Sequence, residues 1–167
     1  MADKADKADN SANEAQPHPA LQFAFEAHVS VDPAIDLGDI AKGRRRIVPI
    51  TGGEFAGPDL RGTVLPGGAD WQIMRGDDVA ELEARYILRT DDGALIHVRN
   101  HAFRHGPPEI MAALAAGRPV DPASYYFRGA AFFETSAVRY AWITRHIIVC
   151  TGVREPAGVK LSFYKVL

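Results

Sequence analysis

The amino-acid sequence predicts an all-β protein, a single antiparallel β-barrel of about 8–10 strands with one short helix. Two observations lead to this fold class. Apolar and polar residues alternate along most of the chain, which is the pattern of strands that bury one face. The connectors between these runs are short and rich in Gly, Pro and Asp, which favours antiparallel neighbours. We favour a barrel over an open sheet because closure removes exposed edge strands.

The predicted strands follow one another from Leu21 to the end of the chain. The first strand places six apolar residues on one face: Leu21, Phe23, Phe25, Ala27, Val29 and Val31. Further strands are predicted over residues 45–55, 60–65, 71–75, 82–90, 95–103, 125–135, 145–153 and 159–166. Asp91-Asp92-Gly93 supplies a hairpin turn between two of them. The predicted helix covers Pro108 to Ala116, because proline opens it and Gly117 follows its end.

Residues 21–167 are predicted to form one domain, and residues 1–20 a disordered tail. The tail has no apolar run typical of a signal peptide. Its lysines and acidic residues account for the whole net charge of −2, so the body is neutral, which argues against nucleic-acid binding. No stretch is apolar enough to span a membrane. The single cysteine, Cys150, excludes an intrachain disulfide, and we expect a cytoplasmic protein.

The sequence predicts no cofactor and no metal. Phosphate-loop, dinucleotide and hydrolase signatures are absent, and the glycine-rich stretch at 50–58 is interpreted as a bulge or tight turn. His97, His101 and His105 recur every four residues, but strand geometry would set the first two about 13 Å apart, too far for one zinc ion. Arg44–Arg46 is interpreted as a solvated strand face rather than an anion site, and Cys150 as a packing residue rather than a nucleophile.

Polar groups inside apolar strands are the remaining candidates for a site. Arg128 and Glu134 share one strand face, so burial of that face would bury two opposite charges. Asp70 and Arg75 flank the strand that contains Trp71. If these groups line the lumen, they converge in an apolar cavity suited to a small molecule. The alternative is a structural set of buried ion pairs, such as Asp70 with Arg128 or Glu134 with Arg75.

Two further polar residues follow the same logic. Tyr86 shares a strand face with Leu82, Ala84 and Leu88, and Asn100 shares one with Ile96 and Val98. Residues 125–135 and 146–152 are apolar on both faces, whereas a barrel wall buries only one inside it. The other face needs the helix or a second subunit, which predicts a homo-oligomer.

Four stretches resemble domain-of-unknown-function family 3237 of bacteria and fungi: GRRRIVPITGGEFAGPDLRGTVLPGGADWQ, ARYILRTDDGALIHVRN, YYFRGAAFFET and YAWITR. With the strand pattern, the resemblance covers residues 21–166. It implies a compact, usually oligomeric β-barrel similar to those of allene oxide cyclases and dirigent proteins. It implies no settled catalytic set. The positions that match its motifs are Asp70, Trp71, Arg85, Tyr86, Asp92, Gly93, Asn100, Arg128, Glu134 and Trp142.

This chain departs from the family's motifs at three positions. Gly129 and Ala130 stand where threonines commonly follow the arginine, and Thr144 stands where asparagine is common. If those polar groups contact the ligand in relatives, the ligand of this protein differs.

The first functional hypothesis is a cofactor-independent isomerase or cyclase acting on an apolar, oxygenated organic ligand. Glu134 or Asp70 would be a general acid or base, and Arg128 would stabilise an oxyanion. The ligand would be oriented and enclosed by five residues: Trp71, Arg75, Tyr86, Asn100 and Trp142.

Two further hypotheses use the same barrel without chemistry. One is a carrier or sensor of a small hydrophobic ligand, for which replacing Glu134 with Gln would adjust affinity rather than abolish turnover. The other is an interaction module with a filled lumen.

Overall fold

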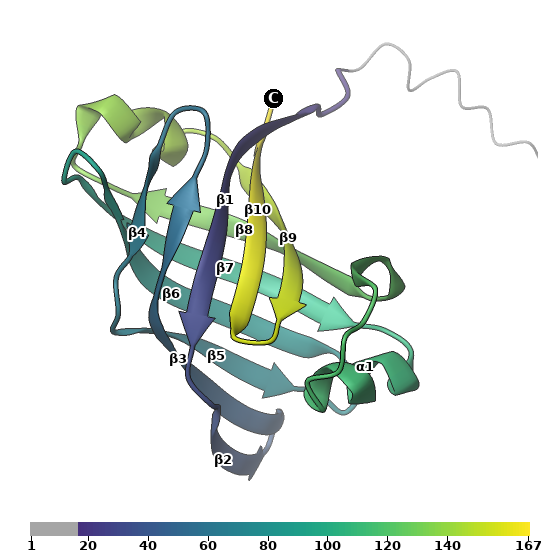
Figure 1. The fold of residues 1–167 in the computed structure, drawn as a ribbon. Coiled ribbons are helices and arrows are strands. Elements are labelled where there is room, and N and C mark those ends of the chain that lie inside the picture. The colour runs from purple at the N-terminus through teal and green to yellow at the C-terminus, as the bar shows by residue number, and fades with distance from the viewer. Residues whose placement is uncertain (1–16) are drawn as a thin grey trace, which may run out of the picture.

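The structure is a computed structural model that describes residues 17–167, so residues 1–16 of the predicted tail lie outside it. Ten strands form one sheet, with the order β1-β10-β9-β8-β7-β6-β4-β3-β2. Pairing of β1 with β3 closes the sheet into a barrel, and β5 joins β6 to β3 beside β4 (Figure 1). All pairings are antiparallel, which confirms the predicted fold class.

The strands correspond closely to the predicted runs. They are β1 (Leu21–Val31), β2 (Ile35–Ile40), β3 (Gly43–Ala56), β4 (Arg61–Val64), β5 (Gly68–Met74), β6 (Ala80–Thr90), β7 (Leu95–His105), β8 (Tyr126–Glu134), β9 (Ile148–Glu155) and β10 (Gly158–Val166). The helices are α1 (Pro108–Ala115) and the short 3-10 helices η2 (Pro122–Ser124) and η3 (Val138–Thr144). The hairpin predicted at Asp91-Asp92-Gly93 joins β6 to β7, with Gly93 at φ 86°.

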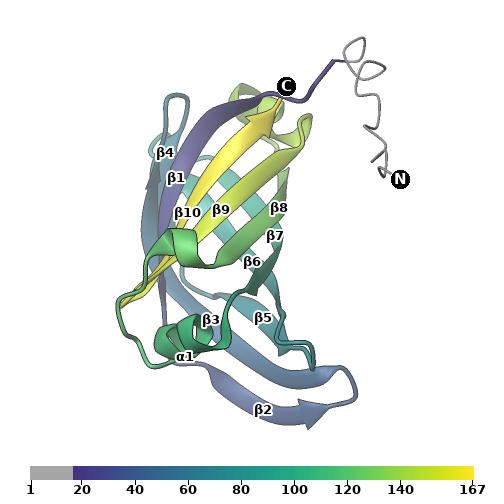
Figure 2. The same ribbon diagram turned by 90° about the vertical axis from the view of Figure 1, so that its right-hand side faces the viewer.

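The sequence did not predict β2 and η3. Strand β2 contains two aspartates and a glycine, residue types that strands disfavour, and it forms only by pairing with the long strand β3. The β2–β3 hairpin extends beyond the barrel wall and leaves Ile35 and Leu37 exposed (Figure 2). Helix η3 lies between β8 and β9 and buries Tyr140 and Ile143.

A bulge in β1 corrects the predicted face of that strand. The register against β10 shifts between Phe23 and Phe25, and the strand parity changes there. Phe25, Ala27 and Val29 are buried as expected, whereas Leu21 and Phe23 are exposed and Ala24 is buried in their place. The prediction of one continuous apolar face from Leu21 is therefore wrong at its first two members.

The glycine-rich segment of β3 is a bulge, one of the two forms predicted for it. Ser30 pairs with Gly52 and Val31 pairs with Ile50, so one extra residue enters β3 between them. Gly53 has φ 138°, and a Cβ there would lie 2.0 Å from the carbonyl oxygen of His28. Only glycine allows β3 to approach β1 this closely.

One end of the lumen is filled with aromatic side chains. Phe25 stacks on Phe163 with ring centroids 4.4 Å apart, and Phe55 and Phe133 meet Phe25 edge-on. Helix η3 covers this end, and α1 lies near the opposite end (Figure 1). Burial of each such ring contributes roughly 2–3 kcal/mol, so this packed end stabilises the barrel.

The outer wall carries several large apolar residues. Tyr126 and Phe132 of β8 are both about half exposed in the single chain. Homo-oligomer formation through such faces stays a prediction. Within residues 17–167, no helix has the length and apolar character needed to span a bilayer.

Candidate functional site

Polar and charged side chains gather in the lumen at the end opposite the aromatic packing. They occupy inward positions of the alternating strands: Arg46 of β3, Asp70 and Gln72 of β5, Tyr86 of β6, Asn100 and Arg104 of β7, and Arg154 of β9. The sheet register sets several of them side by side, with Arg46 opposite Gln72. We call this end of the barrel the polar end.

The polar end surrounds an interior cavity of about 50 Å³, enough for one or a few water molecules. Apolar side chains from β1, β3, β6, β7, β8 and β10 form most of its wall. The cavity adjoins a wider vestibule of about 390 Å³ beneath α1, and Arg104 and Arg154 line both spaces. The vestibule wall includes Met74, Met111 and Leu114. The site is thus an apolar pocket with a charged neck.

Asp70 is the acid of this cavity. Gln72 Nε2 donates to its Oδ2 at 2.7 Å, while its buried Oδ1 has no hydrogen-bond partner. Burial raises the pKa of the Asp70 carboxyl, although Gln72, the backbone of Glu83 and the positive charges of Arg104 and Arg46 act in the opposite direction. A carboxyl with a raised pKa and a free oxygen can donate or accept a proton.

Tyr86 and Asn100 lie on the cavity wall beside Asp70. The Tyr86 hydroxyl is buried without a partner, and burial raises the pKa of this phenol well above its usual range. It is therefore a neutral hydrogen-bond donor. Asn100 Nδ2 donates to Cys150 Sγ at 3.4 Å. Burial also raises the pKa of the Cys150 thiol to about 11, which agrees with a packing role rather than a nucleophilic one.

Three arginines ring the neck of the pocket. Arg46 Nη2 donates to Gln72 Oε1 at 2.9 Å, which links it through Gln72 to Asp70. Arg104 is only 8% exposed, its guanidinium lies 5.6 Å from the Phe127 ring centroid, and its Nε has no partner. Burial and the neighbouring charge of Arg154 lower the pKa of Arg104 to about 10. The group is still cationic at neutral pH.

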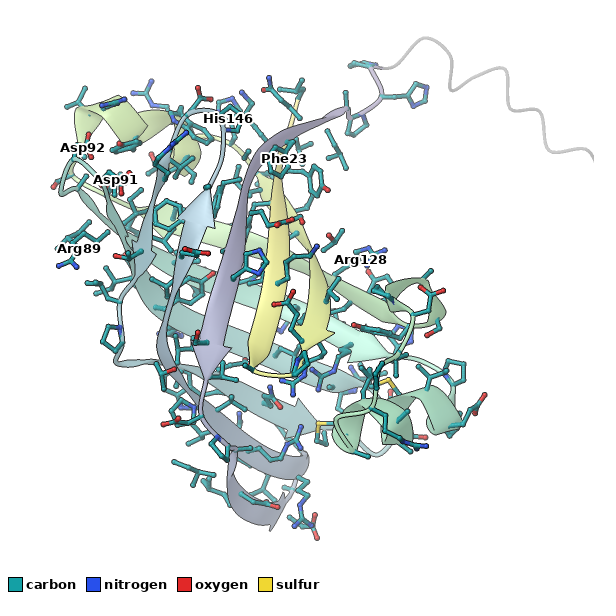
Figure 3. The ribbon with its side chains drawn as sticks, in the orientation of Figure 1. Phe23, Arg89, Asp91, Asp92, Arg128 and His146 are labelled. Atoms are coloured by element: carbon teal, nitrogen blue, oxygen red, sulfur yellow. The ribbon has the colours of Figure 1, made fainter. Side chains whose placement is uncertain are left out.

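The structure does not bring Glu134 and Arg128 into the lumen. They share a face of β8, as predicted, but it is the outer face, so the expectation that both charges are buried is wrong. The Glu134 side chain is 82% exposed and meets His97 Nδ1 at 3.0 Å. Arg128 lies outside the barrel wall, over the Tyr126 ring (Figure 3). The inward positions of β8 are taken by Phe127, Ala131 and Phe133.

The other predicted site residues divide between the pocket and the surface. Asp70, Tyr86 and Asn100 meet in the cavity, and Arg75 reaches the vestibule rim, where it pairs with Asp77 and Glu81. Trp71 points outward and is 37% exposed. Trp142 belongs to η3 at the packed end, under Lys165.

The structure contains neither of the two ion pairs considered from the sequence, Asp70 with Arg128 and Glu134 with Arg75. Arg75 is paired with Asp77 and Glu81 rather than with Glu134. Asp70 is hydrogen-bonded to Gln72, and Arg128 lies outside the barrel.

Sequence reasoning missed Arg46, Gln72, Arg104 and Arg154 as site residues. Strand parity contained the signal for Arg104, because it lies four residues after Asn100 and so shares its face. Arg46 likewise shares a face with Val48 and Ile50. The interpretation of residues 44–46 as a solvated strand face is therefore wrong for Arg46.

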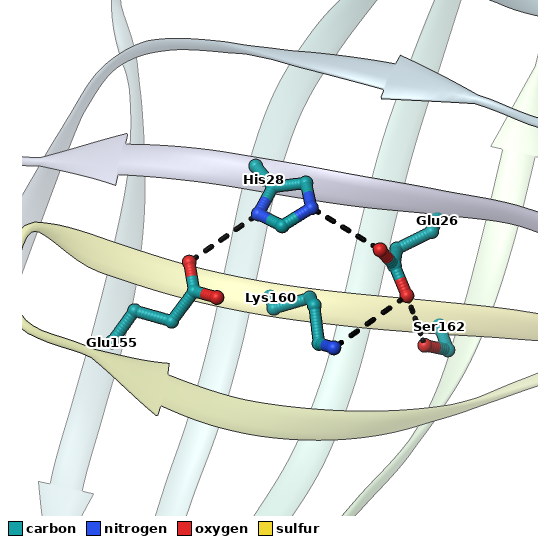
Figure 4. A network of polar contacts seen from close by, with 5 residues as sticks. All are labelled: Glu26, His28, Glu155, Lys160 and Ser162. Atoms are coloured by element: carbon teal, nitrogen blue, oxygen red, sulfur yellow. Dashed lines mark hydrogen bonds and ion pairs between the residues drawn. The ribbon is translucent and has the colours of Figure 1, made fainter. Parts of the chain in front are cut away.

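A second polar cluster lies on the outer face of β1, β9 and β10 (Figure 4). His28 contacts Glu26 at 3.1 Å and Glu155 at 3.3 Å, and Glu26 also accepts from Ser162 at 3.1 Å and meets Lys160 at 3.8 Å. These groups form hydrogen bonds and ion pairs with one another at the surface. Each such exposed pair contributes about 1 kcal/mol or less to the free energy of unfolding. Within residues 17–167, no three His, Cys, Asp or Glu side chains are grouped as metal ligands.

Comparison with known proteins identifies the family to which this barrel belongs. The family model described as "Protein of unknown function (DUF3237)" matches residues 19–166. The chain belongs to the DUF3237 family. A UPF0311 protein of Clostridium acetobutylicum is 45% identical over 143 residues, which is 85% of this chain and 90% of that protein. A crystal structure from Rhodopseudomonas palustris superimposes with a TM-score of 0.88 at 39% identity, over 91% of this chain and 100% of that one.

A more distant relative of this DUF3237 chain has a described activity. The hydroalkoxylation enzyme phnH of Penicillium herquei is 29% identical over 125 residues, which is 75% of this chain and 68% of that protein. A crystal structure of an enzyme from Penicillium herquei has a TM-score of 0.69 at 24% identity, over 92% of this chain and 98% of that one. This second similarity concerns the fold alone.

Proposed function

We propose that this DUF3237 protein is a cofactor-independent isomerase or cyclase that transfers a proton within an apolar, oxygenated small molecule. The observation that carries the proposal is Asp70. This carboxyl is buried, its pKa is raised, its Oδ1 has no hydrogen-bond partner, and Asp70 lines an apolar cavity. Such an acid keeps its proton to a higher pH than an exposed aspartate, and the small apolar cavity leaves little room for competing water once a ligand is bound.

The hydroalkoxylation activity of the fungal relative suggests the type of reaction. Protonated Asp70 would give its proton to one carbon of a C=C bond. A hydroxyl oxygen of the same ligand would bond to the other carbon, and the hydroxyl proton would return to Asp70. Atoms and charge balance without a redox partner. Tyr86 would donate a hydrogen bond to the ligand, and Asn100, held by Cys150, would position it.

Two probes of matching chemistry test this proposal. In 2-prenylphenol a hydroxyl can add to an isolated C=C bond, and in 2′-hydroxychalcone it can add to a conjugated one. We expect the wild-type protein to accelerate ring closure of at least one probe, measured by chromatography of the cyclised product. The variant Asp70→Asn should lower that rate by about 10²–10⁴-fold, as loss of a general acid does.

Two further variants make this assay decisive. Asp91→Asn changes an exposed aspartate in the β6–β7 turn and should leave the rate unchanged. Loss of activity in Glu134→Gln but not in Asp70→Asn would contradict the proposal. It would indicate that Glu134 of β8 is the general acid or base instead. Saturable binding of both probes without conversion of either would favour the carrier hypothesis.

A further inference from the structure

We propose that the neck of the pocket binds a carboxylate group of the ligand, held by Arg46, Arg104 and Arg154. This inference deepens the proposed function, on which it rests for the ligand being a substrate. The predicted ligand is an organic acid with an apolar body.

The first support is the absence of protein counter-charges at these three arginines. Within residues 17–167, no Asp or Glu oxygen lies within 4.0 Å of their guanidinium groups. On the outer surface, by contrast, Arg44 pairs with Asp36 and Arg85 pairs with Glu83. Exposed arginines without an acidic partner, such as Arg89 and Arg99, are solvated by water. The three arginines at the neck are buried or partly buried, so an external anion is the partner that they lack.

Burial makes the missing counter-charge costly. Arg104 is 8% exposed and its Nε–H has no acceptor, and the buried Nε–H of Arg46 also has none. A buried cation without a partner destabilises a protein unless something compensates it. Aspartates 32 and 78 line the vestibule, but both are exposed and neither pairs with these arginines.

Asp70 does not fill this role. Its Oδ2 is held by Gln72, and burial favours its neutral form. Even when Asp70 is ionised, three arginines face one carboxylate at the neck. A planar carboxylate matches the fork of an arginine guanidinium and would satisfy the free Nε–H groups.

The surrounding walls define the rest of the ligand. The vestibule that Arg46, Arg104 and Arg154 share has Met74, Met111 and Leu114 on its wall. Arg104 and Arg154 line the interior cavity as well. A carboxylate at the neck would therefore hold the apolar body between α1 and the lumen, with part of the ligand beside Asp70.

A matched pair of probes tests this inference by isothermal titration calorimetry. 2-Naphthoate and 2-naphthamide have the same size and apolar body and differ in charge. We expect the wild-type protein to bind 2-naphthoate about tenfold or more tightly than 2-naphthamide, with the preference falling as salt rises. Equal affinities, or no saturable binding of 2-naphthoate, would overturn the inference.

Variants test whether the preference for 2-naphthoate over 2-naphthamide depends on the arginines at the neck. Arg104→Gln should remove most of it, and Arg89→Gln, on the exposed outer face of β6, should retain it (Figure 3). If Arg104→Gln does not fold, as judged by circular dichroism, Arg154→Gln carries the test, because Arg154 is only partly buried. Full preference for 2-naphthoate in the folded variants would overturn the inference.

The variant Asp70→Asn separates this inference from the proposed function. It should keep the preference for 2-naphthoate while losing ring closure. If the preference persists and ring closure never depended on Asp70, the carboxylate site stands and the proposed reaction is wrong. If ring closure depends on Asp70 but 2-naphthamide binds as tightly as 2-naphthoate, the reaction stands and the carboxylate site is wrong.

Discussion

The two ends of the lumen are built from the same alternating strands but are filled in opposite ways. At the packed end, Phe25, Phe55, Phe133 and Phe163 interlock. At the polar end, inward positions of β5 and β7 contain Asp70 and Arg104, each with an unpartnered buried atom. One barrel therefore separates a stabilising region from a reactive one along its axis.

This difference indicates that the packed end stabilises the fold and that the polar end contains the candidate site. Aromatic packing lowers the free energy of the folded state, whereas a buried carboxyl with a free oxygen raises it. Proteins retain such costly groups where activity needs them. A filled barrel would leave no space at either end, whereas the polar end of this one contains a cavity of about 50 Å³. Substitutions at the two ends should therefore change stability in opposite directions.

The largest effect is expected at the packed end. Phe163→Ala removes a fully buried ring that stacks on Phe25 and should lower the free energy of unfolding by about 3–5 kcal/mol. Urea denaturation followed by circular dichroism measures it. Phe132→Ala on the outer wall is the matched control, and a loss there as large as that of Phe163→Ala would contradict the division of the lumen.

At the polar end, Asp70→Asn should stabilise the protein at neutral pH, by on the order of 1 kcal/mol. Because the folded-state pKa of Asp70 is raised, the unfolded chain loses this proton near pH 4 while the folded protein keeps it. Wild-type stability therefore falls as pH rises from about 4 toward the folded pKa. The advantage of Asp70→Asn should grow over that range, in denaturation at pH 4, 5, 6 and 7. A variant less stable than wild type at pH 7 would refute this.

The smallest effect is expected on the outer wall. Glu134→Gln removes only an exposed pair with His97 and should change the free energy of unfolding by about 0.5 kcal/mol or less. The same denaturation experiment measures it. A loss of several kcal/mol would mean that Glu134 is buried in solution, for example in an oligomer.

The sequence predicted the strands well because β6 and β7 alternate cleanly. That pattern placed Tyr86 and Asn100 on inward faces, as the structure has them. It failed at β8, where Tyr126 and Phe127 offer an aromatic residue to each face and Gly129 and Ala130 offer no contrast. Closure of the barrel decides which face is inside, and this depends on pairing with β7 and β9.

The bulge in β1 and the arginines at the neck show a second limit. A register shift near Phe23 depends on pairing with β10, which no local pattern encodes. Arg46 was discounted because a short basic run in a neutral protein usually forms a solvated strand face, and Arg104 and Arg154 were not singled out from the sequence. Functional sites are where such rules fail, so the most informative residues were the hardest to predict.

The most direct test of the account is the protonation of Asp70 in the folded protein. The Cγ resonance of Asp70, assigned by its absence from the spectrum of Asp70→Asn, can be followed with pH by ¹³C nuclear magnetic resonance. We expect a midpoint clearly above the ordinary value of about 4, because burial is the largest influence on the pKa of this carboxyl. A midpoint at or below that value would show that Asp70 is ionised in the folded protein, and would contradict its role as the acid.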